Sequence, residues 1–314
     1  ATINAGILTG IFLAARRSSM QDSRRYPGES RFTGWLYLLP AFLIYLVFVL
    51  IPVGQTIINS FYAWNGFGAQ KNYTKLFQEG SAFLEAFSHN LIFIFFYTVI
   101  PVFFGLMLAS LLGRTKLKGL TAFRTLLFLP QVISMIVVGV VWRWVLHPNF
   151  GLVNSFLRIV GLGAWARPWL GDFTWALPAV GSIASWVQYG FCMVLFLAGM
   201  QRIPEEYYEA SSLDGASPWQ QLWKITFPSL RPEIAVALTT TVIAALRVFD
   251  LVFVTTRGSP GTSTMVVGQL IYNTAFIQKQ LGLASAMATV LLVVILLLSR
   301  LIRRYQEAGN EVAR

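Results

Sequence analysis

The chain contains five uninterrupted apolar runs, each long enough to cross a membrane as a helix. A hydrocarbon core of about 30 Å requires roughly 17–25 helical residues, and none of the five runs contains a charged side chain. They are Gly34–Ile57, Asn90–Leu112, Thr125–Trp142, Phe173–Gln201 and Leu281–Ser299. A sixth run, Ile234–Thr256, carries only Arg247 and Asp250. Because lipid offers the backbone no hydrogen-bond partners, the sequence predicts an all-α, polytopic membrane protein with six transmembrane helices.

Composition agrees with a chain that lies mostly in lipid. Charged residues make up 12% of the sequence, against about 25% in soluble domains. The single cysteine, Cys192, excludes an intrachain disulfide and falls inside an apolar run, as a small core residue would. We therefore expect one transmembrane domain over residues 34–305, preceded by a cytoplasmic or interfacial segment, 1–33, and followed by a cytoplasmic tail, 306–314.

Lysine and arginine alternate between the segments that separate the runs. Cytoplasmic loops of membrane proteins are enriched in these residues. Sixteen lie in one set of alternate segments: Arg16, Arg17, Arg24, Arg25, Arg31, Arg114, Lys116, Lys118, Arg124, Arg202, Lys224, Arg231, Arg300, Arg303, Arg304 and Arg314. Seven lie in the other set: Lys71, Lys75, Arg143, Arg158, Arg167, Arg257 and Lys279. This bias predicts that both termini and the loop 201–232 are cytoplasmic, and it explains the net charge of +11 without a nucleic-acid partner.

Two further apolar stretches are too short to span a membrane. Ile3–Ala15 reaches only about 20 Å as a helix, so it is either an interfacial helix or part of an additional membrane segment. Val266–Ile277 is likewise short. We expect it to be interfacial or packed into a vestibule.

The loop 201–232 is polar and predicts a helix–turn–helix. Pro204 suits the first turn of a helix, where no N–H partner is lost. Gly215 tolerates the positive φ that commonly ends a helix. Ser217-Pro218 is typical of the N-cap and first position of a second helix, which we expect Phe227-Pro228 to end. From physical chemistry alone the loop is either a hairpin lying on the membrane or a docking site for another protein.

The spacing within this loop resembles that of a known family. Glu209-Ala210-Ser211-x3-Gly215-x9-Ile225-x-Phe227-Pro228 is similar to the E-A-A-x3-G-x9-I-x-L-P loop of binding-protein-dependent ABC importer permeases, and departs from it at Ser211 and Phe227. The flanking residues 203–208 and 214–216 resemble the sugar-uptake branch, which includes the maltose and glycerol-3-phosphate permeases. Further similarities, such as Leu39-Pro40-Ala41, Phe128-Leu129-Pro130 and Phe249-Asp250, extend the resemblance over roughly residues 34–305.

The resemblance implies a type I ABC importer permease in the bacterial inner membrane. Its partners would be a second homologous permease in a heterodimer, two cytoplasmic ATPase subunits and an extracytoplasmic solute-binding protein. ATP and Mg would bind in the ATPase subunits, and this chain would hold no cofactor or metal and would not be an enzyme. The residues implied in ATPase coupling are Glu209, Ala210, Ser211, Asp214, Gly215, Ala216, Ile225 and Pro228.

Arg247 and Asp250 are the only charges in a predicted span. Ionisable residues at this depth usually face a cavity or a partner, and the i, i+3 spacing would let the two meet on one helix face. They are therefore either a local ion pair or part of a polar lining.

By resemblance to the maltose permease branch, the substrate pathway would contain Gln131, Met135, Val187, Gln188, Thr240, Ala244 and Arg247, with Asp250 beside them. Arg247 stands where that branch has a neutral amide. The cargo implied is a di- or oligosaccharide, neutral or anionic, with glycerol-3-phosphate or a glycerophosphodiester as alternatives.

The sequence agrees less well with two other classes of membrane protein, an intramembrane hydrolase and an ion-coupled secondary transporter. The chain has two histidines and no HExxH or GxSxG motif, which disfavours an intramembrane hydrolase. It also lacks a Gly-Lys dipeptide and hence a phosphate-binding Walker loop, so ATP hydrolysis would have to take place in a partner. An ion-coupled secondary transporter stays as the alternative, although Asp250 is the one membrane carboxylate.

Overall fold

A computed structural model of the protein describes residues 31–63, 66–113 and 119–311. The run Ile3–Ala15 and most of the predicted segment 1–33 lie outside the described residues. The chain divides into two units, one up to Gln55 and one from Thr56 onward, and each is described by itself.

The first unit contains a long apolar helix. It consists of α2 (Arg31–Tyr45), a five-residue π-helical turn (Leu46–Leu50) and the start of α3 (Ile51–Asn59). The stretch Tyr37–Asn59 is long and apolar enough to span a membrane, which confirms the helix predicted over Gly34–Ile57.

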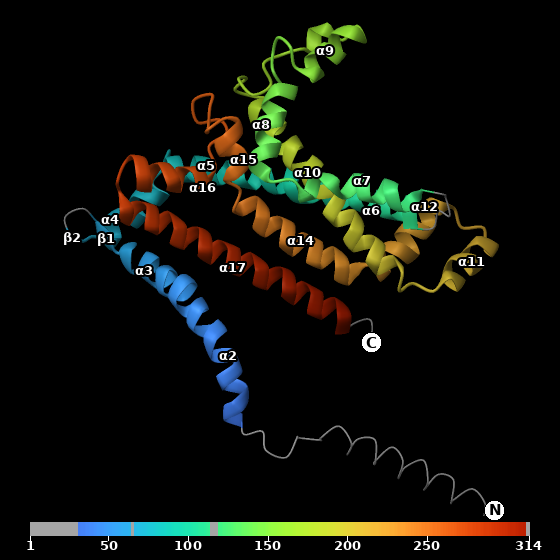
Figure 1. The fold of residues 1–314 in the computed structure, drawn as a ribbon, viewed down its shortest axis with the longest axis horizontal. Helices are drawn as coiled ribbons and strands as arrows, with labels where there is room; N and C mark the ends of the chain where they lie inside the picture. Colours follow the sequence, from blue (N-terminus) through green and yellow to red (C-terminus); the bar gives the residue numbers. More distant parts are fainter. Residues whose placement is uncertain (1–30, 64–65, 114–118, 312–314) are drawn as a thin grey trace, which may run out of the picture. The chain divides into compact units, whose positions relative to one another are not determined.

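The second unit is almost entirely helical (Figure 1). Its first half contains the antiparallel pair β1 (Tyr62–Ala63) and β2 (Gly66–Phe67), then α4 (Ala69–Phe77), α5 (Ala82–Ile94), the π turn η2 (Phe95–Val99), α6 (Ile100–Gly113), α7 (Leu120–Val132), α8 (Met135–Val145), α9 (Leu152–Ile159) and the 3-10 turn Gly163–Trp165. The second half contains α10 (Ala176–Met200), α11 (Glu205–Leu213), α12 (Pro218–Gln221), the π turn η4 (Leu222–Thr226), α13 (Phe227–Ser229), α14 (Arg231–Leu246), α15 (Asp250–Thr255), α16 (Val267–Tyr272), the π turn Asn273–Ile277 and α17 (Leu281–Glu311).

Among the described residues, four helices could each cross a membrane alone. Besides Tyr37–Asn59 these are Ala82–Gly113, Ala176–Met200 and Leu281–Arg304. Two bent pairs, α7 with α8 and α12–α13 with α14, pass the same length and composition test, so the total reaches six if each pair is one span. The upper total equals the six predicted spans in number, but its second pair includes α12 and α13 of the loop 201–232, which the charge bias predicts to lie outside the membrane.

The predicted single helix over Thr125–Trp142 is wrong. The chain bends by 98° between α7 and α8, because Ile133 and Ser134 both have extended backbone ψ angles, near 137° and 135°. Ser134 occupies the N-cap position of α8, a position that serine favours.

The predicted helix over Ile234–Thr256 is also wrong, since it breaks at Arg247–Phe249. α14 ends at Leu246, and α15 begins at Asp250. Arg247 and Asp250 consequently do not share one helix face, and the i, i+3 pairing expected from the sequence fails.

Three prolines inside helices are each preceded by a π-helical turn of the backbone. Before each of Pro52, Pro101 and Pro228 the preceding residue donates its N–H to a carbonyl five positions back: Ile51 to Leu46, Ile100 to Phe95 and Phe227 to Leu222. A proline ring clashes with the carbonyl four residues before it, and a π turn widens the helix at that point. The second helix of the loop 201–232 therefore ends at Ser229, one residue beyond the predicted end at Phe227-Pro228, which is within the usual uncertainty of helix ends.

α10 is the central helix of the second unit and packs mainly on α6 and α7. Gly105 of α6 permits the close approach, because a Cβ there would lie 2.5 Å from Cβ of Cys192. Val266 and Val267 are fully buried, and α16 packs against α5 and α17. The first part of the short run Val266–Ile277 is thus packed inside the protein, whereas Phe276 and Ile277 at its end are 71% and 68% exposed.

In the second unit, α11 and α12 lie at one end, whereas β1, β2 and α4 lie at the opposite end (Figure 1). The polar loop 201–232 is therefore far from the segments that carry Lys71 and Lys75.

Candidate functional site

The turn of the polar loop is a helix-ending motif centred on Gly215. Gly215 has φ +78°, and its N–H donates to the Ser212 carbonyl at 3.1 Å while the Ala216 N–H donates to the Ser211 carbonyl at 2.9 Å. These two bonds satisfy carbonyls that the end of α11 would otherwise leave unpaired. Gly215 thus ends the first helix, as predicted.

The second helix of the loop starts with a capping box. The Ser217 N–H donates to Oε1 of Gln220 at 2.8 Å, and the Gln220 N–H donates to Oγ of Ser217 at 3.3 Å. Such reciprocal bonds pair two N–H groups that have no intrahelical partner. Together with the turn at Gly215 they form what we call the elbow, residues 205–229.

A buried polar cluster holds the two arms of the elbow together. The Tyr208 hydroxyl lies 2.9 Å from Oγ1 of Thr226, and Nε2 of Gln221 donates to Oγ of Ser211 and of Ser212 at 3.0 and 2.8 Å. Ser211, one of the two departures from the family pattern, thereby gains a hydrogen bond that alanine could not make. Sequence reasoning missed Tyr208 and Gln221, whose polar side chains give no sign that they are buried.

The two ends of the loop are clamped at its base. Arg202 forms an ion pair with the buried carboxylate of Glu233, and a Cβ on Gly199 would lie 2.6 Å from the Leu230 side chain. Leu230 is fully buried. The end of α10 and the start of α14 therefore hold the elbow as a rigid projection.

The predicted coupling residues are divided between the surface of the elbow and its interior. Glu209, Ala210, Asp214 and Gly215 are exposed, and the neighbouring Leu213 is 90% exposed. The more enclosed members of the predicted set are Ser211, Ala216, Ile225 and Pro228. Trp219, Trp223 and Phe227 form a row with ring centroids 5.8 and 5.2 Å apart. The tip is thus small, acidic and apolar, as suits insertion into a groove on another protein.

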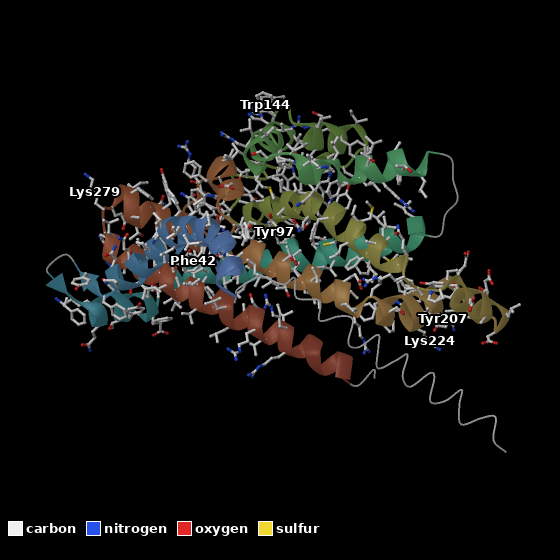
Figure 2. All side chains as sticks on the ribbon, turned by 60° about the horizontal axis from the view of Figure 1, so that its bottom comes forward. Phe42, Tyr97, Trp144, Tyr207, Lys224 and Lys279 are labelled. Atoms are coloured by element: carbon white, nitrogen blue, oxygen red, sulfur yellow. The ribbon has the colours of Figure 1, made fainter. Side chains whose placement is uncertain are left out.

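A cavity of about 380 Å³ contains five of the eight predicted substrate-pathway residues. Its lining includes Met135, Thr240, Ala244, Arg247 and Asp250. Tyr97 also lines it, and Figure 2 shows Tyr97 midway between the end of the second unit that carries Lys279 and the end that carries Tyr207 and Lys224. We call it the central cavity.

Arg247 and Asp250 do not neutralise each other. In the part of the chain that the structure describes, the one ion pair is Arg202–Glu233, while Arg247 and Asp250 are both exposed. Both side chains line the central cavity, and their role in substrate passage stays a prediction.

The remaining predicted pathway residues lie outside this lining. Val187 and Gln188, on α10, are 3% and 5% exposed, and Val187 belongs to the apolar core. Gln131, on α7, has a buried Oε1 without a hydrogen-bond partner. The central cavity thus brings together the predicted residues of α8, α14 and α15 but not those of α7 and α10.

A distant asparagine holds the helix break that presents the two charges. Nδ2 of Asn90 donates to the carbonyls of Ala245 and Leu246 at 3.0 and 3.2 Å. Its Oδ1 accepts the Val267 N–H at 2.8 Å. The side chain is fully buried. It bonds the Leu246 carbonyl at the end of α14 and adds a bond to the Ala245 carbonyl, which also accepts the Val248 N–H at 3.4 Å, so Asn90 is a positioning residue for the central cavity.

Two aromatic residues of the lining were also missed from the sequence. Tyr97 lies inside a long apolar run, and Phe249 packs against Phe253 and Tyr272 with centroids 5.2 and 5.5 Å away. Aromatic residues are common in such runs, so their spacing alone does not mark a cavity. Over the described ranges no group of three or more His, Cys, Asp or Glu side chains could hold a metal ion.

Comparisons with known proteins give consistent matches. The sequence pattern of the family described as binding-protein-dependent transport system inner membrane component matches residues 101–311. A probable ABC transporter permease protein of Bacillus subtilis (strain 168), YurN, is 35% identical over 90% of this chain and 99% of its own length.

Two further similar proteins belong to systems that take up a named saccharide. The diacetylchitobiose uptake system permease protein NgcF of Streptomyces coelicolor is 34% identical over 82% of this chain and 78% of its own length. A bacterial ABC transporter involved in the import of the acidic polysaccharide alginate has a crystal structure that superposes with a TM-score of 0.76 at 26% identity. The match covers 88% of this chain and 96% of that one.

Proposed function

We propose that this chain, which belongs to the family of inner membrane components of binding-protein-dependent transport systems, is the permease subunit of an ATP-driven carbohydrate importer. The observation that carries the proposal is the pairing of a rigid docking elbow at one end of the second unit with a polar cavity near its middle (Figure 2). An importer needs both parts, one to receive mechanical work and one to hold the cargo.

The elbow is the part that would receive work from an ATPase. Its exposed Glu209 would pair with a basic residue of the ATPase, and its tip around Leu213 would enter a cleft there. Because the base is clamped through Arg202, Glu233 and Gly199, a push on the tip would move α10 and α14 together. ATP binding in two partner subunits would then bias the chain and its partner permease between inward- and outward-facing packings.

The central cavity would hold the sugar. Its volume lies in the range of about 300–1,000 Å³ that is typical of small-molecule sites. Thr240 and Tyr97 offer hydroxyls, Arg247 offers donors, and Asp250 offers acceptors. This mixture suits a hydroxyl-rich solute, and the sugars named for two of the relatives support the same class. Arg247 would also accommodate an acidic group, as on a uronate oligosaccharide.

Reconstitution tests the proposal. The chain, its partner permease and the two ATPase subunits would be placed in proteoliposomes, and uptake of labelled oligosaccharides measured with and without the binding protein. We expect uptake to require both ATP and the binding protein, and to survive a proton uncoupler. Uptake that ends with the uncoupler while ATP is present would instead indicate an ion-coupled secondary transporter. Uptake restricted to glycerol-3-phosphate or a glycerophosphodiester would refute the carbohydrate assignment.

A further inference from the structure

A second cavity of about 440 Å³ lies at the end of the second unit opposite the elbow. It is bounded by the segment after Asn59, by α4 and by the start of α17. Figure 2 labels Lys279 at this end and Lys224 at the other. The bias in basic residues predicts that this end is extracytoplasmic.

Three lysines line this cavity: Lys71, Lys75 and Lys279. No carboxylate is among its lining residues, and among the residues that the structure describes none of the three lysines forms an ion pair. Glu79 lines an adjacent cavity that shares Lys75. We call the first one the lysine cavity. It concentrates positive charge without a counter-charge, which favours an anionic occupant.

The backbone adds to this preference. The first residues of α17, Leu281–Leu283, form part of the lining. N–H groups in the first turn of a helix have no intrahelical partner and carry the positive end of the helix dipole. In a helix of 31 residues that end is well developed, so the start of α17 and the lysine side chains favour the same ligand charge.

The wall of the lysine cavity is held in place by close contacts. Nδ2 of Asn72 donates to the carbonyls of Ser60 and Tyr62, both at 3.0 Å. Gly282 lets the Tyr62 carbonyl approach the start of α17, because a Cβ there would collide with that oxygen. The cavity is thus formed by packing and does not depend on the lysine side chains.

Apolar side chains stand beside the charged ones. Tyr62 and Leu281 both line the lysine cavity and are 50% and 62% exposed. Two further residues of the same end, Phe67 and Ile277, are 79% and 68% exposed. In a membrane protein such surface is typical of the interface with lipid, so the anion that reaches this cavity would carry apolar chains.

We propose that the lysine cavity binds a phosphate-type anion, presented as the headgroup of an anionic phospholipid in the outer leaflet. The three ammonium groups and the start of α17 contact the phosphate, while Tyr62 and Leu281 contact the first part of an acyl chain. This inference concerns the seating of the protein in its bilayer and does not depend on the cargo.

Native mass spectrometry of the full chain tests this proposal. Phosphatidylglycerol and phosphatidylcholine would be compared as probes, and inorganic phosphate in detergent would separate a lipid site from one for a soluble anion. A juxtamembrane lysine contributes about fivefold to the binding of an anionic headgroup. The triple variant Lys71→Gln, Lys75→Gln, Lys279→Gln should therefore lose roughly 100-fold in phosphatidylglycerol affinity.

Two controls accompany the triple variant. The charge-retaining change of the same three lysines to arginine should keep the preference for phosphatidylglycerol. Arg143→Gln removes a basic charge from the same predicted side of the membrane, outside the lysine cavity, and should also keep it. The single variant Lys279→Gln, with an expected loss of about fivefold, gives an independent measurement if the triple variant does not fold.

Three outcomes would overturn the proposal. Equal retention of phosphatidylglycerol and phosphatidylcholine by the unmodified chain would show that the headgroup charge is not read. Unchanged phosphatidylglycerol binding in the glutamine variants would show that the lysines are not the site. Displacement of the lipid by inorganic phosphate at equal concentration would indicate a soluble anion as the ligand.

Discussion

Gly215 shows how much of the elbow depends on one backbone dihedral. Its φ is +78°, and a Cβ added there would meet no atom within 4 Å. Substitution at this position therefore causes backbone strain without a steric clash. The effect of backbone strain on the function of the elbow can thus be tested without disturbing side-chain packing.

We expect Gly215→Val to cost about 1–2 kcal/mol, because an L-residue other than glycine is disfavoured in this conformation. Gly215→Asn should cost less, since asparagine tolerates it. Co-purification of the ATPase and ATP-driven uptake should follow that order, with membrane insertion unchanged. Equal behaviour of the two variants would contradict a role for the φ angle.

Arg247 is the residue on which the charge of the cargo depends. It is exposed to the central cavity and has no ion pair with Asp250. Its guanidinium is therefore available to a carboxylate of the solute.

Arg247→Gln should lower the uptake of acidic oligosaccharides by about 10- to 100-fold, since a hydrogen bond to a charged group contributes about 1.5–3 kcal/mol. Neutral oligosaccharides should lose much less. Asp250→Asn, the matched change of opposite sign, should leave acidic uptake equal or higher. Competition uptake assays measure both. An equal loss for both solute classes would point to a packing role for Arg247.

At the scale of the elements, helix breaks and π turns decide where side chains point. Pro52, Pro101 and Pro228 each follow a π turn and do not end their helices. The break that matters most for the central cavity, at Arg247–Phe249, contains neither proline nor glycine. It depends instead on the amide of Asn90.

We expect Asn90→Ala to remove three hydrogen bonds at about 1 kcal/mol each. The melting temperature should fall by several degrees, and the KM for uptake should rise as the lining moves. Asn90→Asp retains the acceptor for the Val267 N–H and should be intermediate. Ser88→Ala, two residues away on the exposed side of α5, is the control. An alanine variant that matches this control in both measurements would exclude the positioning role.

At the scale of the whole molecule, the elbow and the lysine cavity lie at opposite ends of the second unit (Figure 1). This arrangement fits one orientation in the membrane, with the elbow in the cytoplasm. The excess of basic residues predicts the same orientation.

Labelling with a membrane-impermeant maleimide tests this orientation of the protein in the membrane. Leu213→Cys, at a position 90% exposed, should react only in inverted vesicles. Phe67→Cys, at a position 79% exposed, should react in intact spheroplasts. The native Cys192 is fully buried and should give little background. The reverse pattern would place the elbow outside the cytoplasm and would contradict the proposed coupling to an ATPase.

Much of this architecture follows from short-range features of the sequence. Apolar runs of sufficient length dictate membrane helices because lipid leaves the backbone no other partners. The turn at Gly215 and the cap at Ser217 were predictable because their hydrogen bonds join residues no more than five positions apart. Such interactions form within the local chain and need no tertiary context.

The central cavity was only partly predictable, for the opposite reason. At the break after Leu246, the Leu246 carbonyl accepts a hydrogen bond from Asn90, which lies 156 positions earlier in the chain. The break between α7 and α8 has no strong signal in the local sequence. Tyr97, from the π turn η2, and Phe249, from the break itself, line the same cavity although they lie far apart in the sequence. The sequence by itself determined a membrane-embedded helical protein with a helix–turn–helix loop around Gly215. The tertiary structure decided where two of its helices break; at the break after Leu246 the physical reason is the side chain of Asn90, distant in sequence, which donates to the carbonyls at the end of α14.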